Sequence, residues 1–124
     1  SGAGINRVTD GATGAVDSTI TIGDTIDIEG DKVRIAGDAE GVGVFFIDVS
    51  GAVTQATGRL RRNDPKFVQI QVPATLSKGT QYTLRIVTQY TTGTGLLKEP
   101  RTIEFERPLT TSGDGGGGDR PEIE

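Results

Sequence analysis

The ionisable side chains of this sequence limit the chemistry it can do, because its 124 residues contain no His and no Cys. These two residue types are the commonest general bases and thiol nucleophiles near neutral pH. Carboxylate chemistry remains, since the chain holds 17 Asp and Glu residues. Without Cys there can be no disulfide and no thiolate metal site, and the redox compartment is left open.

Six acidic residues in the first third of the chain could in principle supply the oxygen ligands that Ca²⁺ prefers. They are Asp24, Asp27, Glu29, Asp31, Asp38 and Glu40. No D-x-D-x-D-G loop is present, and Asp27 and Glu29 fit the solvated face of a strand. Paired carboxylates for glycoside hydrolysis lack support too, because Trp is absent and both Tyr residues fall on a predicted core face. We therefore predict no metal, no cofactor, no small-molecule substrate and no catalytic residue.

The one cluster of basic residues consists of Arg59, Arg61, Arg62 and Lys66. Arg59 and Arg61 would project on the same side of a strand, which suits contact with phosphates or with an acidic peptide. The alternative is an ordinary solvated edge, where Lys and Arg discourage aggregation. The net charge of −4 opposes a DNA-binding surface over the whole chain, although a local basic stripe remains compatible with it.

Residues 113–124 differ in composition from the rest of the chain. They contain four consecutive Gly residues, Gly115 to Gly118, and carry four acids against one Arg, a net charge of −3. Such a stretch cannot bury apolar surface, so we predict a folded domain over 1–112 and a flexible tail over 113–124. The end of the tail, DRPEIE, is a candidate ligand for the basic cluster of its own or another copy, through Asp119, Glu122, Ile123 and Glu124.

Period-two alternation of apolar residues predicts strands along the whole domain, and no segment has helical periodicity over three turns. The expected strands cover Ile5–Asp10, the run from Ile20 to Ile28, Val33–Ile35, Val42–Val49, Val53–Thr57, Phe67–Val72, Tyr82–Tyr90 and Thr102–Arg107. Gly30-Asp31 would be a turn or a bulge, and Asn63 to Lys66 a turn around Pro65. This pattern predicts an all-β sandwich of seven or eight mostly antiparallel strands with essentially no helix.

Two further features concern the connections. Leu76, Gly79 and Tyr82 have the spacing L-x-x-G-x-x-Y, which resembles the tyrosine corner of immunoglobulin-like sandwiches. In that corner a Tyr hydroxyl bonds to backbone a few residues upstream, and we expect the corner to connect the two sheets. The pair Leu96-Leu97 would either cap the core, which we favour, or form an exposed apolar contact.

The sequence resembles a known family in ITIGDTIDIEGDKVRIAGD (20–38), GVGVFF (41–46), NDPKFVQIQVPATLSKGTQYTLRIVTQY (63–90), LLKEPRTIEFERPLT (96–110) and the terminal GGGGDRPEIE. This family is an immunoglobulin-like domain of unknown function at the C-terminus of bacterial proteins whose N-terminal domain is histone-like (HU-type) and binds DNA. The Gly positions are similar, more distantly, to transcription-factor-type immunoglobulin (IPT/TIG) domains. The resemblance supplies no catalytic residue.

The resemblance implies a noncatalytic interaction module of unknown ligand that contacts a protein partner or itself, in the cytoplasm or on the nucleoid. DNA binding would then belong to an N-terminal domain absent from this chain, which begins without Met and reads as a fragment. The alternatives are direct nucleic-acid contact through the basic cluster and an extracellular adhesive or carbohydrate-associated module. With no apolar run of 18 residues and no leader pattern, we expect no membrane span and no signal peptide in the chain.

Overall fold

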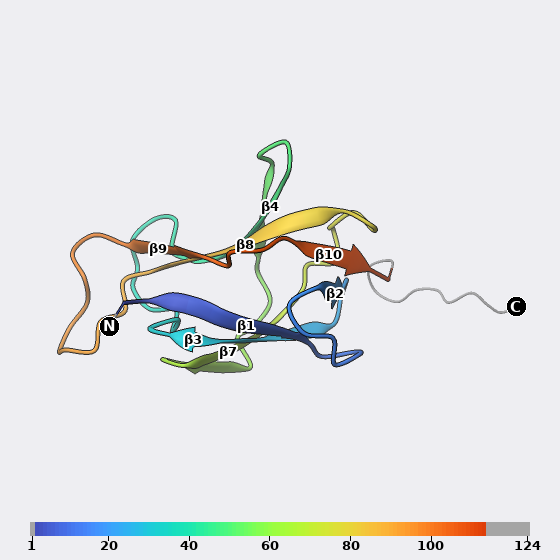
Figure 1. Ribbon diagram of the computed structural model, residues 1–124. Coiled ribbons are helices and arrows are strands. Elements are labelled where there is room, and N and C mark those ends of the chain that lie inside the picture. Colours follow the sequence, from blue (N-terminus) through green and yellow to red (C-terminus); the bar gives the residue numbers. More distant parts are fainter. Residues whose placement is uncertain (1, 114–124) are drawn as a thin grey trace, which may run out of the picture.

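The computed structural model describes residues 2–113, which form ten strands and no helix. A four-stranded sheet contains, in spatial order, β1 (Gly4–Asp10), β3 (Thr25–Asp31), β7 (Phe67–Gln71) and β6 (Arg62–Asp64). A six-stranded sheet contains β2 (Thr19–Thr21), β10 (Leu109–Ser112), β8 (Gln81–Thr88), β4 (Gly43–Asp48) and β5 (Val53–Ala56), and β9 (Arg101–Glu104) also pairs with β8. The two sheets face each other as layers (Figure 1), so the all-β sandwich prediction is confirmed.

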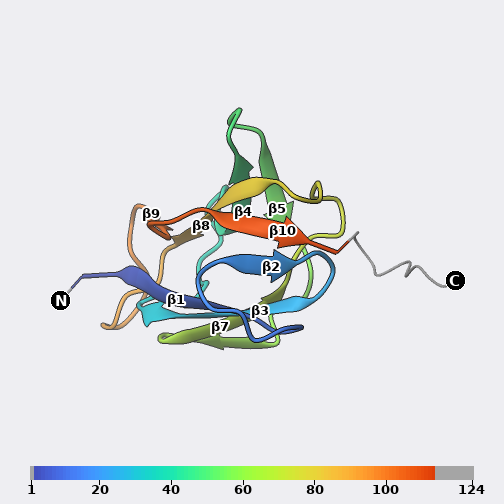
Figure 2. The same ribbon diagram turned by 45° about the vertical axis from the view of Figure 1, so that its right-hand side comes forward.

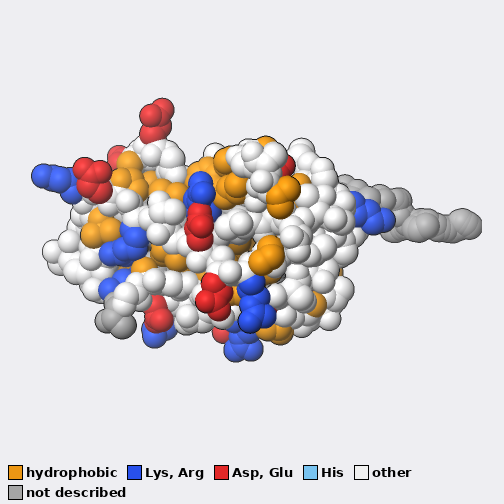
Figure 3. Space-filling view, turned by 45° about the horizontal axis from the view of Figure 1, so that its top comes forward, with side chains coloured by type: hydrophobic (Ala, Val, Ile, Leu, Met, Phe, Trp, Pro, Cys, Tyr) orange, Lys and Arg blue, Asp and Glu red, His pale blue; other side chains and the backbone are white. Residues whose placement is uncertain are grey.

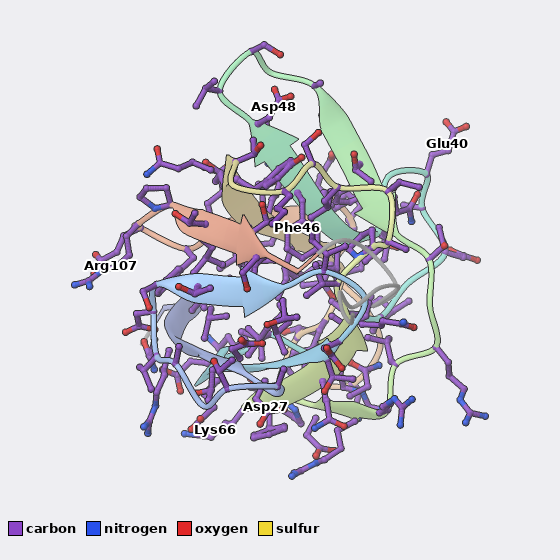
Figure 4. All side chains as sticks on the ribbon, turned by 90° about the vertical axis from the view of Figure 1, so that its right-hand side faces the viewer. Asp27, Glu40, Phe46, Asp48, Lys66 and Arg107 are labelled. Atoms are coloured by element: carbon purple, nitrogen blue, oxygen red, sulfur yellow. The ribbon has the colours of Figure 1, made fainter. Side chains whose placement is uncertain are left out.

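The core lies between the two layers and follows the alternation of the sequence. On β8 the buried residues are Tyr82, Leu84, Ile86 and Thr88, and the residues between them are at least partly exposed. On β3 the buried Ile26 and Ile28 alternate with half-buried acids. Phe46 of β4 is fully buried and points into the space between the sheets (Figure 4). Because apolar area removed from water stabilises by about 25 cal/mol per Å², these inward faces hold the layers together.

The alternating run from Ile20 to Ile28 is two strands in two different sheets, not one strand. Gly23 has a φ of 87°, and the chain turns there from β2 in the six-stranded sheet to β3 in the four-stranded sheet. The Gly23 N–H donates to the Val72 carbonyl at 3.0 Å, and the Val72 N–H donates to the Asp24 carbonyl at 2.8 Å. β2 then pairs with β10 in parallel, beside it in Figure 2, and this is the one parallel pairing within 2–113.

The predicted strand Val33–Ile35 is wrong, as is the predicted break at Gly30-Asp31. Both of the latter residues belong to β3, and the chain leaves the ladder at Lys32, whose φ is 58°. Val33 is fully buried, but its N–H donates to the Pro65 carbonyl at 2.8 Å, at a turn rather than in a ladder. The alternation of apolar residues at 33–35 therefore indicates burial, but it does not indicate strand pairing.

The C-terminal part of the domain contains a strand that the sequence did not reveal. The predicted strand Thr102–Arg107 ends at Glu104, although Phe105 stays buried. After Pro108 the chain forms β10, whose Leu109 and Thr111 face inward and whose other two residues are half-buried. β6 (Arg62–Asp64) is also unexpected, since a turn was predicted from Asn63 to Lys66. β10, β6 and the split at Gly23, less the missing strand at Val33–Ile35, give ten strands in the described residues instead of the predicted seven or eight.

Strand ends and one loop also differ from expectation. Val49 is 87% exposed in the turn after β4, because β4 ends at Asp48. Tyr90 is half-buried instead of on the core face, because the alternation breaks at the consecutive buried residues Thr88 and Gln89. Leu96 is 52% exposed, so it does not cap the core, whereas Leu97 is half-buried.

The segment between β7 and β8 carries the chain from the four-stranded to the six-stranded sheet. Here the Ser77 N–H donates to the Tyr82 hydroxyl at 2.9 Å, Leu76 is buried, and Gly79 has a φ of 67°. Thr111 of β10 holds the same segment from the other side: its hydroxyl donates to the Ser77 carbonyl at 2.5 Å and accepts from the Thr80 N–H at 3.0 Å.

Replacing Tyr82 by Phe is expected to lower the free energy of unfolding by about 1 kcal/mol, because the Ser77 N–H loses its acceptor. Urea unfolding measures the change. Tyr90→Phe is the matched control, since within 2–113 the Tyr90 side chain has no hydrogen-bond partner. An unchanged midpoint for Tyr82→Phe would show that the hydroxyl contributes nothing.

Candidate interaction surface

The predicted basic cluster lies where the chain passes from β5, at the edge of the six-stranded sheet, to β6, at the edge of the four-stranded sheet. Arg59 and Arg61 precede β6, so the prediction that they share one face of a strand is wrong. The physical reason is that the chain must bridge two sheets here, which stack roughly 10 Å apart. It reaches the ladder of the four-stranded sheet only at Arg61, whose N–H donates to the Gln69 carbonyl at 2.9 Å. We name residues 57–61 the crossover.

Two of the four basic residues are held by acids on their own sheet. Arg62 forms a 2.7 Å ion pair with Asp64, and its guanidinium lies 4.1 Å from the centre of the Phe67 ring. Lys66 pairs with Asp31 at 3.2 Å. Arg59 and Arg61 are exposed and have no ion pair within the described residues. Of the four basic residues in the cluster, only Arg59 and Arg61 are therefore without an acidic partner within the described residues.

The Lys66 ammonium lowers the pKa of the Asp31 carboxyl, through a hydrogen bond and through its charge. Lys66→Gln is therefore expected to raise the pKa of Asp31 towards the ordinary range of an aspartate. Because the folded-state pKa is lowered, the pair stabilises the fold above the unfolded-state pKa, and that stabilisation is lost as the pH falls through the folded-state pKa.

Carboxyl NMR titration of Asp31 in both forms measures this shift. Asp48, whose pKa is lowered by Ser50 and the Ala52 N–H instead, serves as the internal control and should not move. An Asp31 titration that is the same with and without Lys66 would mean that Lys66 is available to an external anion.

Elsewhere on the surface, positive and negative side chains alternate. Arg7 pairs with Glu29 at 3.5 Å across β1 and β3, and Arg85 pairs with Glu104 at 2.7 Å across β8 and β9. The face in Figure 3 likewise shows Lys and Arg interspersed with Asp and Glu. Residues 2–113 contain 12 basic and 13 acidic side chains, which leaves a net charge of −1.

A shallow groove of about 240 Å³ adjoins the crossover. Its walls come from β5 and the crossover on one side and from β7 and the following corner on the other, and include Gln55, Thr57, Gly58, Gln71, Pro73 and Ala74. Gln71 donates its side-chain amide to the Gly23 carbonyl at 2.6 Å, and Gln55 is exposed. We call this the crossover groove; it combines amide groups with a small apolar wall.

The six acids considered for a metal do not converge on one point: three of them follow one another along β3 and are paired with different partners. Asp27 accepts from Gln69 at 2.7 Å, whereas Glu29 and Asp31 pair with Arg7 and Lys66. Within 2–113 no three acidic, His or Cys side chains gather closely enough to hold an ion. The tail residues Asp119, Glu122, Ile123 and Glu124 lie outside the described residues.

The hairpin that joins β4 to β5 is a surface feature that the sequence did not single out. It projects from the sandwich with Asp48 near its tip (Figure 4). One Asp48 carboxyl oxygen accepts from the Ser50 N–H, the Ser50 hydroxyl and the Ala52 N–H at 2.7–3.0 Å, so the turn is ordered by its own side chains. Val49 and Val53 are 87% and 55% exposed on it, an apolar tip that alternation alone does not predict.

Two buried polar residues follow one another at the end of β8. Alternation along Tyr82–Tyr90 puts Thr88 on the core face, but sequence reasoning missed the burial of Gln89 and the backbone contacts of both. Thr88 and Gln89 are 0% and 8% exposed and tie the end of β8 to residues 34–39. Gln89 also bonds to the Leu97 carbonyl at 3.0 Å. The signal that could have found them is the failure of alternation at two adjacent polar positions. Their partners are backbone groups, so they hold loops in place and offer no ligand site.

Comparison with known proteins places these features in a family. A family model described as "Domain of unknown function (DUF4469) with IG-like fold" matches residues 4–103. A solved structure from Bacteroides vulgatus ATCC 8482, named "Putative bacterial DNA binding protein", is similar with a TM-score of 0.80 and 32% sequence identity. The similarity covers 89% of this chain and 47% of that protein, so this chain spans about half of its length.

No curated protein matches this chain. Residues 2–113 contain no helix that could cross a membrane. The family match extends from the first strand into β9 and includes the four-stranded sheet, the corner and the crossover; of the six-stranded sheet it leaves out β10. The family description agrees with the predicted immunoglobulin-like fold, and the chain belongs to the DUF4469 family of domains of unknown function with an immunoglobulin-like fold.

Proposed function

We propose that this chain is a noncatalytic interaction module within a larger DNA-binding protein, and that its own contacts are made to protein. The observation that supports this most strongly is the distribution of charge. Affinity for nucleic acid comes largely from Lys and Arg residues that displace counterions from phosphates. Here two of the four clustered basic residues are paired with Asp64 and Asp31, and residues 2–113 have a net charge of −1.

The DNA-binding part would be an HU-like domain on the N-terminal side of this chain, which would place the protein in the cytoplasm or on the nucleoid. Two observations support this extension. The sequence resembles domains found in that arrangement, and the similar B. vulgatus protein is about twice as long as the part this chain matches. The sequence that precedes Ser1 in the parent gene tests it directly: an unrelated or secreted segment there would contradict it.

Salt-dependent binding to duplex DNA tests the module itself. For the isolated chain we expect weak binding whose logarithm falls with the logarithm of salt concentration with a slope no steeper than about −2, since two basic residues are uncommitted. Arg61→Glu should reduce such binding, and Lys98→Glu, an exposed charge reversal in the loop before β9, is the matched control. A slope of about −4 or steeper would reject the proposal in favour of direct DNA binding.

Direct nucleic-acid contact is the second candidate, and the crossover groove is the observation that favours it. The groove walls carry the exposed side chains of Gln55 and Gln71, and Arg59 directly follows the wall residue Gly58 in the sequence. Arg and Gln side chains are common in contacts with phosphates and base edges. The same titration separates the two functions, because only direct binding requires tight, Arg61-dependent association.

A further inference from the structure

We propose that the acidic segment Asp119–Glu124 docks in cis in the crossover groove, with Arg59 and Arg61 as its cationic contacts. This inference rests on the proposed interaction-module function and gives it a ligand class, an acidic peptide that this chain itself supplies. The argument combines the position of the groove, the point where the described chain ends, the reach of the connecting residues and the charges on both sides.

The described chain ends next to the groove wall. The Ser112 carbonyl at the end of β10 accepts from the Ile22 N–H at 2.8 Å, and Gly113 lies against Thr21. The residue after Ile22 is Gly23, which bonds to both Val72 and Gln71 on the groove wall, at 3.0 and 2.6 Å. The two adjacent residues Ile22 and Gly23 therefore connect the end of β10 to the groove wall.

The connecting residues are long enough for docking within one molecule. Five residues, 114–118, separate Gly113 from Asp119, and such a stretch spans up to roughly 17 Å when extended. Four of them are Gly. A short Gly-rich linker gives a tethered segment an effective concentration in the millimolar range. A weak site on the same molecule would thus be occupied before a second copy at micromolar concentration competes.

The charges of the two partners are complementary. Residues 114–124 contain four acids and one Arg. On the groove side, Arg59 directly follows the wall residue Gly58, and Arg61 comes two residues later. Both are exposed and without an ion pair within 2–113. Asp119, Glu122 and Glu124 can pair with the two Arg residues. Pro73 and Ala74 provide an apolar wall for Ile123.

Amide NMR of the chain with and without residues 114–124 tests the docking, in the absence of DNA. We expect the amide signals of Gly58, Gln71 and Ala74 to shift on truncation. Addition of a peptide of residues 114–124 in trans should move them back. Asp119→Asn, Glu122→Gln and Glu124→Gln together should reproduce the truncated spectrum, because the pairing charges are gone.

Charge reversal on the groove side completes the test. Arg59→Glu with Arg61→Glu should weaken binding of the peptide roughly tenfold or more. Lys98→Glu with Arg107→Glu, an equal change in net charge, should not; Figure 4 shows Arg107 on the side away from the crossover. If the amide signals of the groove residues do not shift on truncation, the inference is wrong. If the shifts grow with protein concentration, the segment contacts a second copy and does not dock in cis. The DNA titration is repeated on the chain without residues 114–124, where the acidic segment cannot compete for the two Arg residues, so the proposed function is tested separately from the docking.

Discussion

Replacing Gly30 by Ala is expected to destabilise the domain by about 3 kcal/mol, at the upper end of what overpacking costs. A Cβ at this position would lie 2.1 Å from the Gly4 carbonyl oxygen, 3.0 Å from the Ile5 Cα and 2.9 Å from a Val33 methyl carbon. Two of these neighbours are backbone atoms of β1, so no change of side-chain rotamer relieves the contact. β1 would have to move away from β3, at the point where Ile5 pairs with Gly30.

Urea unfolding of Gly30→Ala measures the loss, and Gly4→Ala is the matched control. Gly4 lies in the same strand pair, yet a Cβ added there meets no atom within 4 Å. We expect Gly4→Ala to change stability by less than about 0.5 kcal/mol, as surface substitutions usually do. If the two variants unfold at the same urea concentration, the close approach of β1 to β3 is not what requires Gly at position 30.

The sequence predicted the inward faces of the strands well, for a physical reason. Side chains alternate across a strand, so the residues at i and i+2 share a face whatever the strand order is. Ile26 and Ile28 on β3, and Leu84 and Ile86 on β8, were recognised in this way, and all four are fully buried. Alternation does not say which sheet a strand joins, and for that reason the turn at Gly23 divided a run that looked continuous.

The candidate surface was less predictable, because it depends on where the connections run. Four basic residues within eight positions look like one patch in the sequence. In the structure two of them meet Asp64 and Asp31, and Asp31 lies 35 positions away from Lys66. The groove beside Arg59 is equally nonlocal, since its walls come from β5, the crossover, β7 and the corner. Residue spacing in the sequence does not reveal contacts between segments that are far apart along the chain.

The turn after β1 holds the second large effect that we expect. Asp10, predicted only as the end of a strand, is 1% exposed and its carboxylate accepts four hydrogen bonds. Two come from Ala12 and Thr13 in the turn that follows β1, and two from the N–H and hydroxyl of Thr21 on β2. β1 and β2 belong to different sheets, so one carboxylate ties the layers together at their edge.

Asp10→Ala is therefore expected to cost about 3 kcal/mol in the free energy of unfolding. The substitution leaves the Thr21 N–H without its acceptor, and it removes the 2.7 Å acceptor of the Thr21 hydroxyl, which keeps only the Ser112 hydroxyl at 3.4 Å. It also leaves a cavity at a site that is 1% exposed, and each unpaired buried group costs about 1–3 kcal/mol, less what water entering the cavity recovers. Asp10→Asn should cost less, because its carbonyl oxygen still accepts from the Thr21 N–H. Urea unfolding of both variants gives the ranking, with Asp38→Ala, an exposed loop acid, as the control.

A double-mutant cycle with Thr21→Val then isolates the tie between the sheets from the local turn. We expect Asp10→Ala and Thr21→Val to be nonadditive by about 1 kcal/mol or more, as for residues that share a hydrogen bond. Additive effects would mean that Asp10 acts through Ala12 and Thr13 alone. In that case the Asp10 carboxylate would order only the turn after β1, and apolar packing would hold the two layers together at this edge.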